Sequence, residues 1–182
     1  QRIAEPGQTP SHGVAQRLWH VRAGQVILAT GSIERPMAFA HNDRPGVMLS
    51  QAVRTYVRRF GVVPGKRVVI ATNNDDAYKT AYALKAAGAE IVAVLDARPA
   101  PAGADSGLPV YHNAVPLSTK GARHCLKSVT ALVYGLTKSW DADLIAVSGG
   151  FTPVVHLHMQ AGGTLDWNDA AQAFVPAHRV RM

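Results

Sequence analysis

The chain has 182 residues, of which 47% are hydrophobic, and a formal net charge of +7. This length suits one domain of ordinary size or two small ones, and the apolar share is that of a globular protein. No apolar run approaches the ~20 residues that span a bilayer, and no signal-peptide pattern opens the sequence, so we expect a cytoplasmic protein without a membrane partner. The single cysteine, Cys125, excludes an internal disulfide, a Cys-x-x-Cys redox pair and a multi-cysteine zinc site.

The positive charge is dispersed along the chain. Its densest group comprises Arg54, Arg58, Arg59, Lys66 and Arg67, and no aromatic residues are regularly interleaved with it. Proteins that bind nucleic acid usually concentrate their basic residues in a patch or stripe. We therefore expect no nucleic-acid partner, and an anionic partner subunit or cofactor explains the charge as well.

The first elements predicted in chain order form a hairpin over about 16–30. Residues 17–22 alternate apolar with polar side chains, which predicts a half-buried strand, and Ala23-Gly24 is a two-residue turn. The apolar run 26–29 predicts a short buried strand that ends at Thr30-Gly31. Because ligands bind outside the carboxyl ends of strands in open α/β sheets, this turn is the best single place for a site.

A βαβ unit is predicted in the middle of the chain. Before it, apolar residues spaced as on a helix run from Val47 to Phe60, and Gly61 ends this helix. A buried strand over 66–72, a helix over about 76–87 and a second buried strand over 90–96 follow. Strand, helix and strand within about 30 residues are typical of a right-handed βαβ unit with a parallel sheet.

The last third predicts mainly strands. Two of them, over 110–118 and 124–134, are joined at Lys120-Gly121 and form a small β-meander. A short buried strand over 141–148 ends in two glycines, and the chain from Trp167 onward is expected to be largely irregular. The whole order indicates an α/β protein with a nucleotide-fold core.

The loop of the βαβ unit lacks the features of a phosphate-binding loop. Residues 72–77 contain no glycine, and Asp75 and Asp76 place negative charge where phosphates would bind. We interpret Asp75 as the N-cap of a structural helix. Asp96 ends the second strand, where a ribose-binding acid belongs, but without the glycine loop we favour a structural role.

No constellation for acid–base or nucleophilic catalysis is found, and we expect neither catalytic residues nor a metal site. His156 and His158 would share a face on a strand, yet no acidic residue or cysteine stands near them. Cys125 is interpreted as a small core or edge residue. Glu34-Arg35 is interpreted as a local ion pair.

Five segments of the sequence resemble the alpha subunit of heterotetrameric sarcosine oxidase. They also resemble the related large subunits of opine oxidases, hydrogen cyanide synthase and N-methylglutamate dehydrogenase. The likeness runs from about residue 17 to residue 176. The segments that carry it are Val26–Pro36, Asn42–Leu49, Ala71–Ala77, Val94–Pro99 and Asp143–Pro153.

The resemblance implies a three-layer, Rossmann-like, FAD/NAD(P)-binding fold that is incomplete in this chain. Residues 1–47 would be the end segment of a first dinucleotide-binding domain. Residues 48–140 would be an inserted nucleotide-binding-like domain with a degenerate phosphate loop, and residues 141–182 would return to the first domain. The family's Gly-x-Gly-x-x-Gly loop and folate-binding domain have no counterpart in these residues.

The resemblance also implies an oxidoreductase subunit. The family oxidises secondary amines such as sarcosine with flavins, and sarcosine oxidase passes the one-carbon unit to tetrahydrofolate. NAD or FAD would be bound mainly by parts of the protein outside this chain, with FMN, FAD and tetrahydrofolate elsewhere in a complex with other subunits. The residues that match a cofactor contact are Ala29, Thr30 and Gly31.

Two other functions remain open from the sequence. The segment could be a non-catalytic scaffold or interaction module that retains the dinucleotide fold. It could also belong to the large subunit of an opine oxidase or N-methylglutamate dehydrogenase. A free-standing thiol reductase of the same class is excluded by the single cysteine.

Overall fold

A five-stranded parallel sheet forms the centre of the structure, a computed structural model that describes residues 18–100, 107–122 and 125–177. Its strand order is β2-β9-β3-β4-β5, and all four pairings are parallel. Apolar runs with few polar side chains form its inner strands because both faces of this sheet are covered. The strands are β2 (Val47–Leu49), β3 (Arg67–Thr72), β4 (Glu90–Asp96), β5 (Val110–His112) and β9 (Leu144–Ser148).

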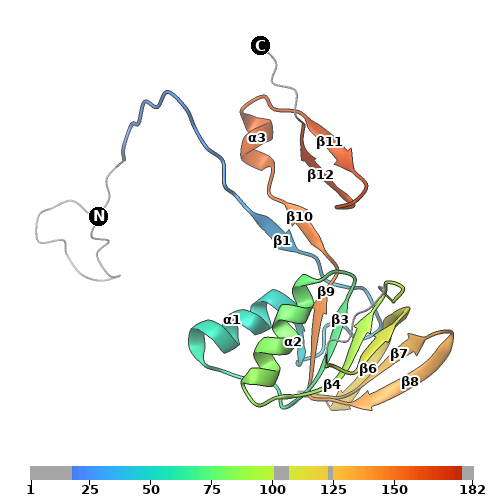
Figure 1. Ribbon diagram of the computed structural model, residues 1–182. Helices are drawn as coiled ribbons and strands as arrows, with labels where there is room; N and C mark the ends of the chain where they lie inside the picture. The colour runs from blue at the N-terminus through green and yellow to red at the C-terminus, as the bar shows by residue number, and fades with distance from the viewer. Residues whose placement is uncertain (1–17, 101–106, 123–124, 178–182) are drawn as a thin grey trace, which may run out of the picture.

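Two helices, α1 (Ser50–Phe60) and α2 (Asp76–Ala86), cover one face of the sheet (Figure 1). Val53 of α1 and Leu84 of α2 are fully buried against strand residues such as Ile70. Gly61 ends α1 in the left-handed conformation, with φ 65°, as predicted. The predicted helix over 76–87 and its flanking parallel strands are likewise confirmed.

A three-stranded antiparallel sheet covers the other face. It consists of β6 (Ala114–Ala122), β7 (Cys125–Val133) and β8 (Leu136–Asp141), in that order. Val129 and Ala131 of β7 pack on Val69 and Leu95 of the parallel sheet. Successive strand residues point to opposite faces, so Val69 and Ile70 serve the two cores separately. The three layers and the β-meander confirm the predicted fold class.

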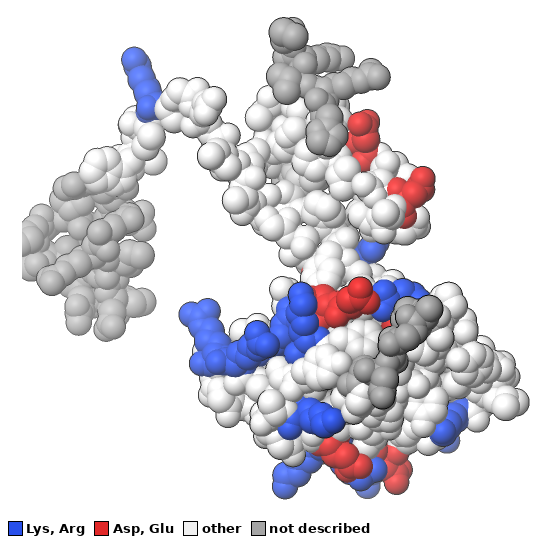
Figure 2. Space-filling model, in the orientation of Figure 1, with Lys and Arg blue, Asp and Glu red and all other residues white. Residues whose placement is uncertain are grey.

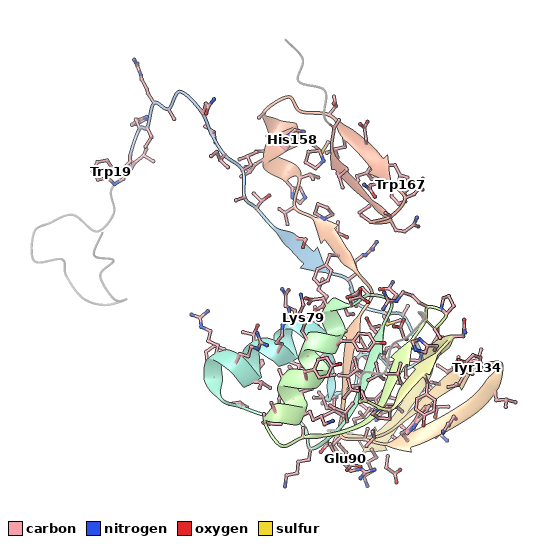
Figure 3. All side chains as sticks on the ribbon, in the orientation of Figure 1. Trp19, Lys79, Glu90, Tyr134, His158 and Trp167 are labelled. Atoms are coloured by element: carbon pink, nitrogen blue, oxygen red, sulfur yellow. The ribbon has the colours of Figure 1, made fainter. Side chains whose placement is uncertain are left out.

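A smaller group of elements lies beyond the carboxyl ends of the parallel strands (Figure 1). It comprises the antiparallel pair β1 (Ser32–Glu34) and β10 (Phe151–Pro153), the short helix α3 (His156–Gln160), and the hairpin of β11 (Leu165–Asn168) and β12 (Ala173–Pro176). Lys79 and Glu90 lie at opposite edges of the sheet, with Lys79 at the edge facing this group (Figure 3). Two chain segments therefore connect the smaller group to the sheet.

The predicted hairpin over 16–30 is wrong for the residues that the structure describes. Residues 18–31 form no helix or strand and are exposed throughout, and Trp19 lies far from the three layers (Figure 3). Ile27 is 90% exposed and Val26 76% exposed, so the predicted burial of the 26–29 run is also wrong. The apolar pattern is present, but no described element packs against it, and a strand needs a pairing partner to form.

Three smaller predictions also need correction. The turn of the meander does not lie at Lys120-Gly121, because β6 continues through both residues and Gly121 pairs with Leu126. The tail from Trp167 is not irregular, since it forms a hairpin in which Trp167 meets Phe174 edge-on. Strand β8 was not predicted at all. Among the described residues, no helix is long and apolar enough to cross a membrane.

Candidate functional site

The Ala29-Thr30-Gly31 turn is tied to the segment after β10. The Thr30 hydroxyl donates to the carbonyl of Val154 at 2.5 Å, and the Val154 amide donates to the carbonyl of Gly31 at 3.0 Å. Gly31 has a φ of +69°, which glycine adopts without strain. A Cβ atom at this position would meet nothing within 4 Å. The turn is thus fixed by its backbone, while its outer side is open.

The carboxyl end of β3 is closed by the side chain of Asn74. Its amide nitrogen donates to the carbonyl and hydroxyl of Ser148 at the end of β9, at 3.2 and 3.0 Å. Its amide oxygen accepts from the Asp76 amide at 3.1 Å and so caps α2. Thr72 folds the loop by exchanging hydrogen bonds with the backbone of Asn74. Asn74 therefore fills the helix N-terminus at which a phosphate would bind.

The prediction that Asp75 caps α2 through its side chain is wrong. Asp75 has helical backbone angles and makes no side-chain cap bond, whereas a capping side chain normally sits on an extended residue. The Asp75 carboxylate instead accepts from Arg98 at 2.7 Å. An asparagine just before a helix is itself a capping signal, so Asn74 could have been chosen from the sequence.

Two cations neutralise Asp76 in the first turn of α2. Arg54 of α1 donates to one carboxylate oxygen at 2.7 Å, and Lys79 donates to the other at 3.1 Å. Burial alone would raise the pKa of Asp76, but these hydrogen bonds and charges outweigh burial and hold the pKa below its usual value. Figure 2 shows acidic and basic side chains side by side at this edge of the sheet.

Asp96, at the end of β4, is fully buried and fully engaged by its own chain. One oxygen accepts from the backbone and Nε of Arg98, both at 3.0 Å. The other accepts from the Tyr78 hydroxyl at 2.9 Å and from Arg98 Nη2 at 2.8 Å. Burial opposes ionisation, but the bonds from Arg98 and Tyr78 hold the pKa of Asp96 below its usual value. Burial and the adjacent Asp96 raise the pKa of Tyr78.

This arrangement leaves Asp96 no free oxygen for a ribose hydroxyl. A ribose-binding carboxylate must accept hydrogen bonds from its ligand, and here the protein already supplies the donors. The structure thus agrees with the structural role that the sequence favoured for Asp96.

Glu34 and Arg35 lie where the smaller group joins the sheet, and neither was identified as a key residue from the sequence. The Glu34 carboxylate is 4% exposed and accepts from the Gln51 amide in the first turn of α1 at 2.8 Å. The Arg35 backbone exchanges hydrogen bonds with Gly149 and Gly150, each at 2.8 Å. Arg35 also donates to the carbonyl of Gln172 in the β11–β12 hairpin at 3.1 Å. The predicted ion pair between Glu34 and Arg35 is wrong, because their side chains bind these separate partners.

The histidine pair does not form a metal centre. His156 and His158 lie on helix α3 rather than on a strand, so two residues apart they do not face each other. His158 lies in the smaller group (Figure 3), and its Nε2 is 3.0 Å from the carbonyl of Thr164. Within the described ranges no three His, Cys, Asp or Glu residues are grouped to hold a metal. Cys125 is exposed at the start of β7, as an edge residue.

Comparison with known proteins identifies the relatives of this chain. No protein-family profile matches it. The sarcosine oxidase alpha subunit of Corynebacterium sp. (strain U-96) is 43% identical over 177 residues, which are 91% of this chain and 18% of the relative. The protein of the same name from Rhizobium meliloti (strain 1021) is 40% identical over 177 residues, or 96% of this chain and 17% of the relative.

The chain is homologous to a segment of the sarcosine oxidase alpha subunit. It spans less than a fifth of the length of these curated relatives. An opine oxidase subunit of Agrobacterium tumefaciens (strain Ach5) is more distant, at 29% identity over 181 residues, which are 86% of this sarcosine oxidase alpha homologue and 36% of the relative.

Solved structures of oxidoreductases share the fold of this sarcosine oxidase alpha homologue. Thioredoxin reductase of T. acidophilum has a TM-score of 0.61 at 15% identity and covers 75% of this chain and 47% of its own. L-proline dehydrogenase of P. horikoshii has a TM-score of 0.58 at 20% identity, covering 84% of this chain and 27% of its own. At such identities the likeness establishes the fold alone.

Proposed function

We propose that this chain is part of the large subunit of a hetero-oligomeric, flavin-dependent oxidoreductase that oxidises a secondary amine such as sarcosine. The identity of 43% to a sarcosine oxidase alpha subunit over 91% of the chain carries this proposal. Tetrahydrofolate would accept the one-carbon unit, and FMN, FAD and folate would bind elsewhere in the complex. The sequence contains no catalytic constellation, so the segment would support a cofactor and contact other subunits.

Within this function, Ala29, Thr30 and Gly31 form one wall of a site for NAD or FAD. The fixed backbone of the turn and the open space beside Gly31 support this role, since a dinucleotide must approach a backbone closely. Residues 1–47 and 141–182 would belong to the dinucleotide-binding domain, and residues 48–140 to the inserted one. The remaining walls would come from other parts of the protein.

The substitution Gly31→Asn in the full-length protein, assembled with its partners, tests the wall. Asparagine tolerates a positive φ, so the change adds bulk on the open side of the turn with little backbone strain. Gly88→Asn is the matched control, because Gly88 also has a positive φ, of +88°, and open space around its Cβ position. We expect G31N to lower dinucleotide affinity at least about tenfold and G88N to leave it unchanged. Equal affinities in the two variants would contradict the proposal.

The alternative, a scaffold without a cofactor, makes a different prediction in the same experiment. Purified wild-type complex would then contain no dinucleotide in contact with this segment, and sarcosine oxidation would not depend on residue 31. The opine oxidases are the second group that resembles the chain, at lower identity. Assays of the full complex with sarcosine and with an opine distinguish the two substrates.

A further inference from the structure

Both helix N-termini at the carboxyl edge of the parallel sheet are occupied by side chains of the chain itself. Such N-termini carry partial positive charge and free amides, and they are the places where α/β sheets bind anionic ligands. Asn74 caps α2 from within its own loop. At α1 the capping group comes from Glu34, which lies 17 residues before Gln51 and belongs to the strand β1.

The setting of the Glu34 carboxylate resembles that of a bound anion. The group is buried, with the residue 4% exposed, and forms no ion pair with any described cation. One of its oxygens, Oε2, accepts from the Gln51 amide, and the other, Oε1, is buried without a hydrogen-bond partner among the described residues. Helix α1 has no side-chain cap of its own at residue Leu49. A buried carboxylate without a cation is costly unless other positive groups surround it, and the helix N-terminus provides them.

We infer that Glu34 is an internal ligand of the inserted sheet: its carboxylate occupies the α1 N-terminus in place of an external anion and attaches β1 to the sheet. The same short stretch of chain is held a second time, because the backbone of Arg35 is bonded to Gly149 and Gly150. The edge at which this fold usually binds a ligand therefore serves to hold the segment that leads to Thr30 and Gly31. Only the statement that this positioning serves dinucleotide binding rests on the proposed function.

Removal of the carboxylate and its replacement from solution test the internal ligand. Glu34→Ala removes the same heavy atoms that acetate contains, so acetate fits the resulting space and can accept from Gln51. Hydrogen exchange, measured by mass spectrometry on the full-length assembled protein, reports the amides in the first turn of α1. We expect these amides to exchange about tenfold faster in E34A, because loss of a charge-assisted bond favours local opening. Acetate should restore slow exchange, whereas chloride at equal ionic strength should not.

Two further variants keep the inference falsifiable. Glu34→Gln fills the space and keeps an acceptor, so it should fold, lose part of the protection and show no response to acetate. Glu90→Ala is the matched control, since Glu90 is exposed at the opposite edge of the sheet and pairs with Arg67 (Figure 3). Unchanged exchange in E34A, or exchange that acetate and chloride alter equally, would overturn the inference. Dinucleotide affinity is measured separately, so a failed cofactor role leaves the anion test interpretable.

Discussion

At the scale of single residues, the carboxyl edge of the sheet is held by buried charges. Asp96 receives four hydrogen bonds from two residues, Arg98 and Tyr78, and Arg98 also reaches Asp75. A buried carboxylate is stable only when its partners remain in place. These side chains stabilise the end of β4 and leave no room for a ribose, so their role here is structural.

Removal of Arg98 should therefore destabilise the fold strongly. Arg98→Ala leaves Asp96 buried with the Tyr78 hydroxyl as its remaining side-chain donor, and we expect a loss of about 3 kcal/mol in the free energy of unfolding. Urea denaturation followed by circular dichroism measures this loss. As a control, Glu90→Ala removes an exposed pair with Arg67 and should cost at most about 1 kcal/mol. Similar losses in both variants would contradict the assigned role of Asp96.

The lowered pKa values of Asp76 and Asp96 predict a stability that depends on pH. Each carboxyl has a lower pKa in the folded than in the unfolded protein, where the value is about 3.9. Their contribution is therefore complete above about pH 4 and is lost as the pH falls through the lower folded values. Urea denaturation at about pH 7 and about pH 3 measures the loss.

The variant Asp76→Asn identifies the source of this dependence. It should be less stable than the wild type at neutral pH and should lose less stability on acidification. Asp43→Asn, at an exposed loop position, should retain the wild-type pH dependence. A wild-type acid dependence in D76N would show that other groups cause it.

At the scale of elements, the junction between the sheet and the smaller group depends on close backbone approach. Gly149 follows β9, and a Cβ there would lie 2.7 Å from the carbonyl oxygen of Pro36 and 3.1 Å from that of Arg35. Both contacts are with backbone, which cannot move aside as a flexible side chain does. Glycine at this position therefore permits the two connecting segments to lie side by side.

Gly149→Ala should force these segments apart. We expect a destabilisation of about 1–3 kcal/mol, typical of overpacking at a close contact. Gly24→Ala is the control, because a Cβ at Gly24 meets nothing within 4 Å and its φ is not positive. Thermal unfolding of both variants, monitored by calorimetry, measures the difference. If G149A is as stable as G24A, the junction is looser than its contacts indicate.

At the scale of the whole molecule, the chain contains a well-packed inserted unit and an open remainder. The parallel sheet has a buried core on each face. By contrast, Val26, Ile27 and Leu28 are exposed although their pattern is that of a buried strand. The relatives are more than five times as long as the matched segment. A dinucleotide site that includes Gly31 would thus need residues from outside this chain.

The isolated chain should consequently show no measurable stabilisation by NAD or FAD. A ligand raises the unfolding temperature only if it binds the folded form, and one wall of a site gives too little contact. Thermal shift assays with each dinucleotide measure this. The full-length assembled protein, as the positive control, should respond to at least one of them. A clear shift with the 182-residue chain alone would mean that its own residues form a complete site.

The sequence by itself determined the βαβ unit, because its apolar runs, the glycines at 61 and 88 and the helical spacing of buried residues are local patterns. It also determined that the βαβ loop is no phosphate cradle, since the missing glycines and the two acids are visible in one segment. The likeness to sarcosine oxidase alpha subunits was present in five short segments and is confirmed by the relatives.

Only the tertiary structure decided how the carboxyl edge is filled. The bond from Gln51 to Glu34 joins residues on different elements, and the bond from Asn74 to Ser148 joins residues 74 positions apart. Such contacts depend on how strands are ordered in the sheet, which no local pattern encodes. The 26–29 run shows the same limit in reverse. Its apolar pattern correctly indicates what the segment can bury, but burial requires a packing partner, and none of the described residues supplies one.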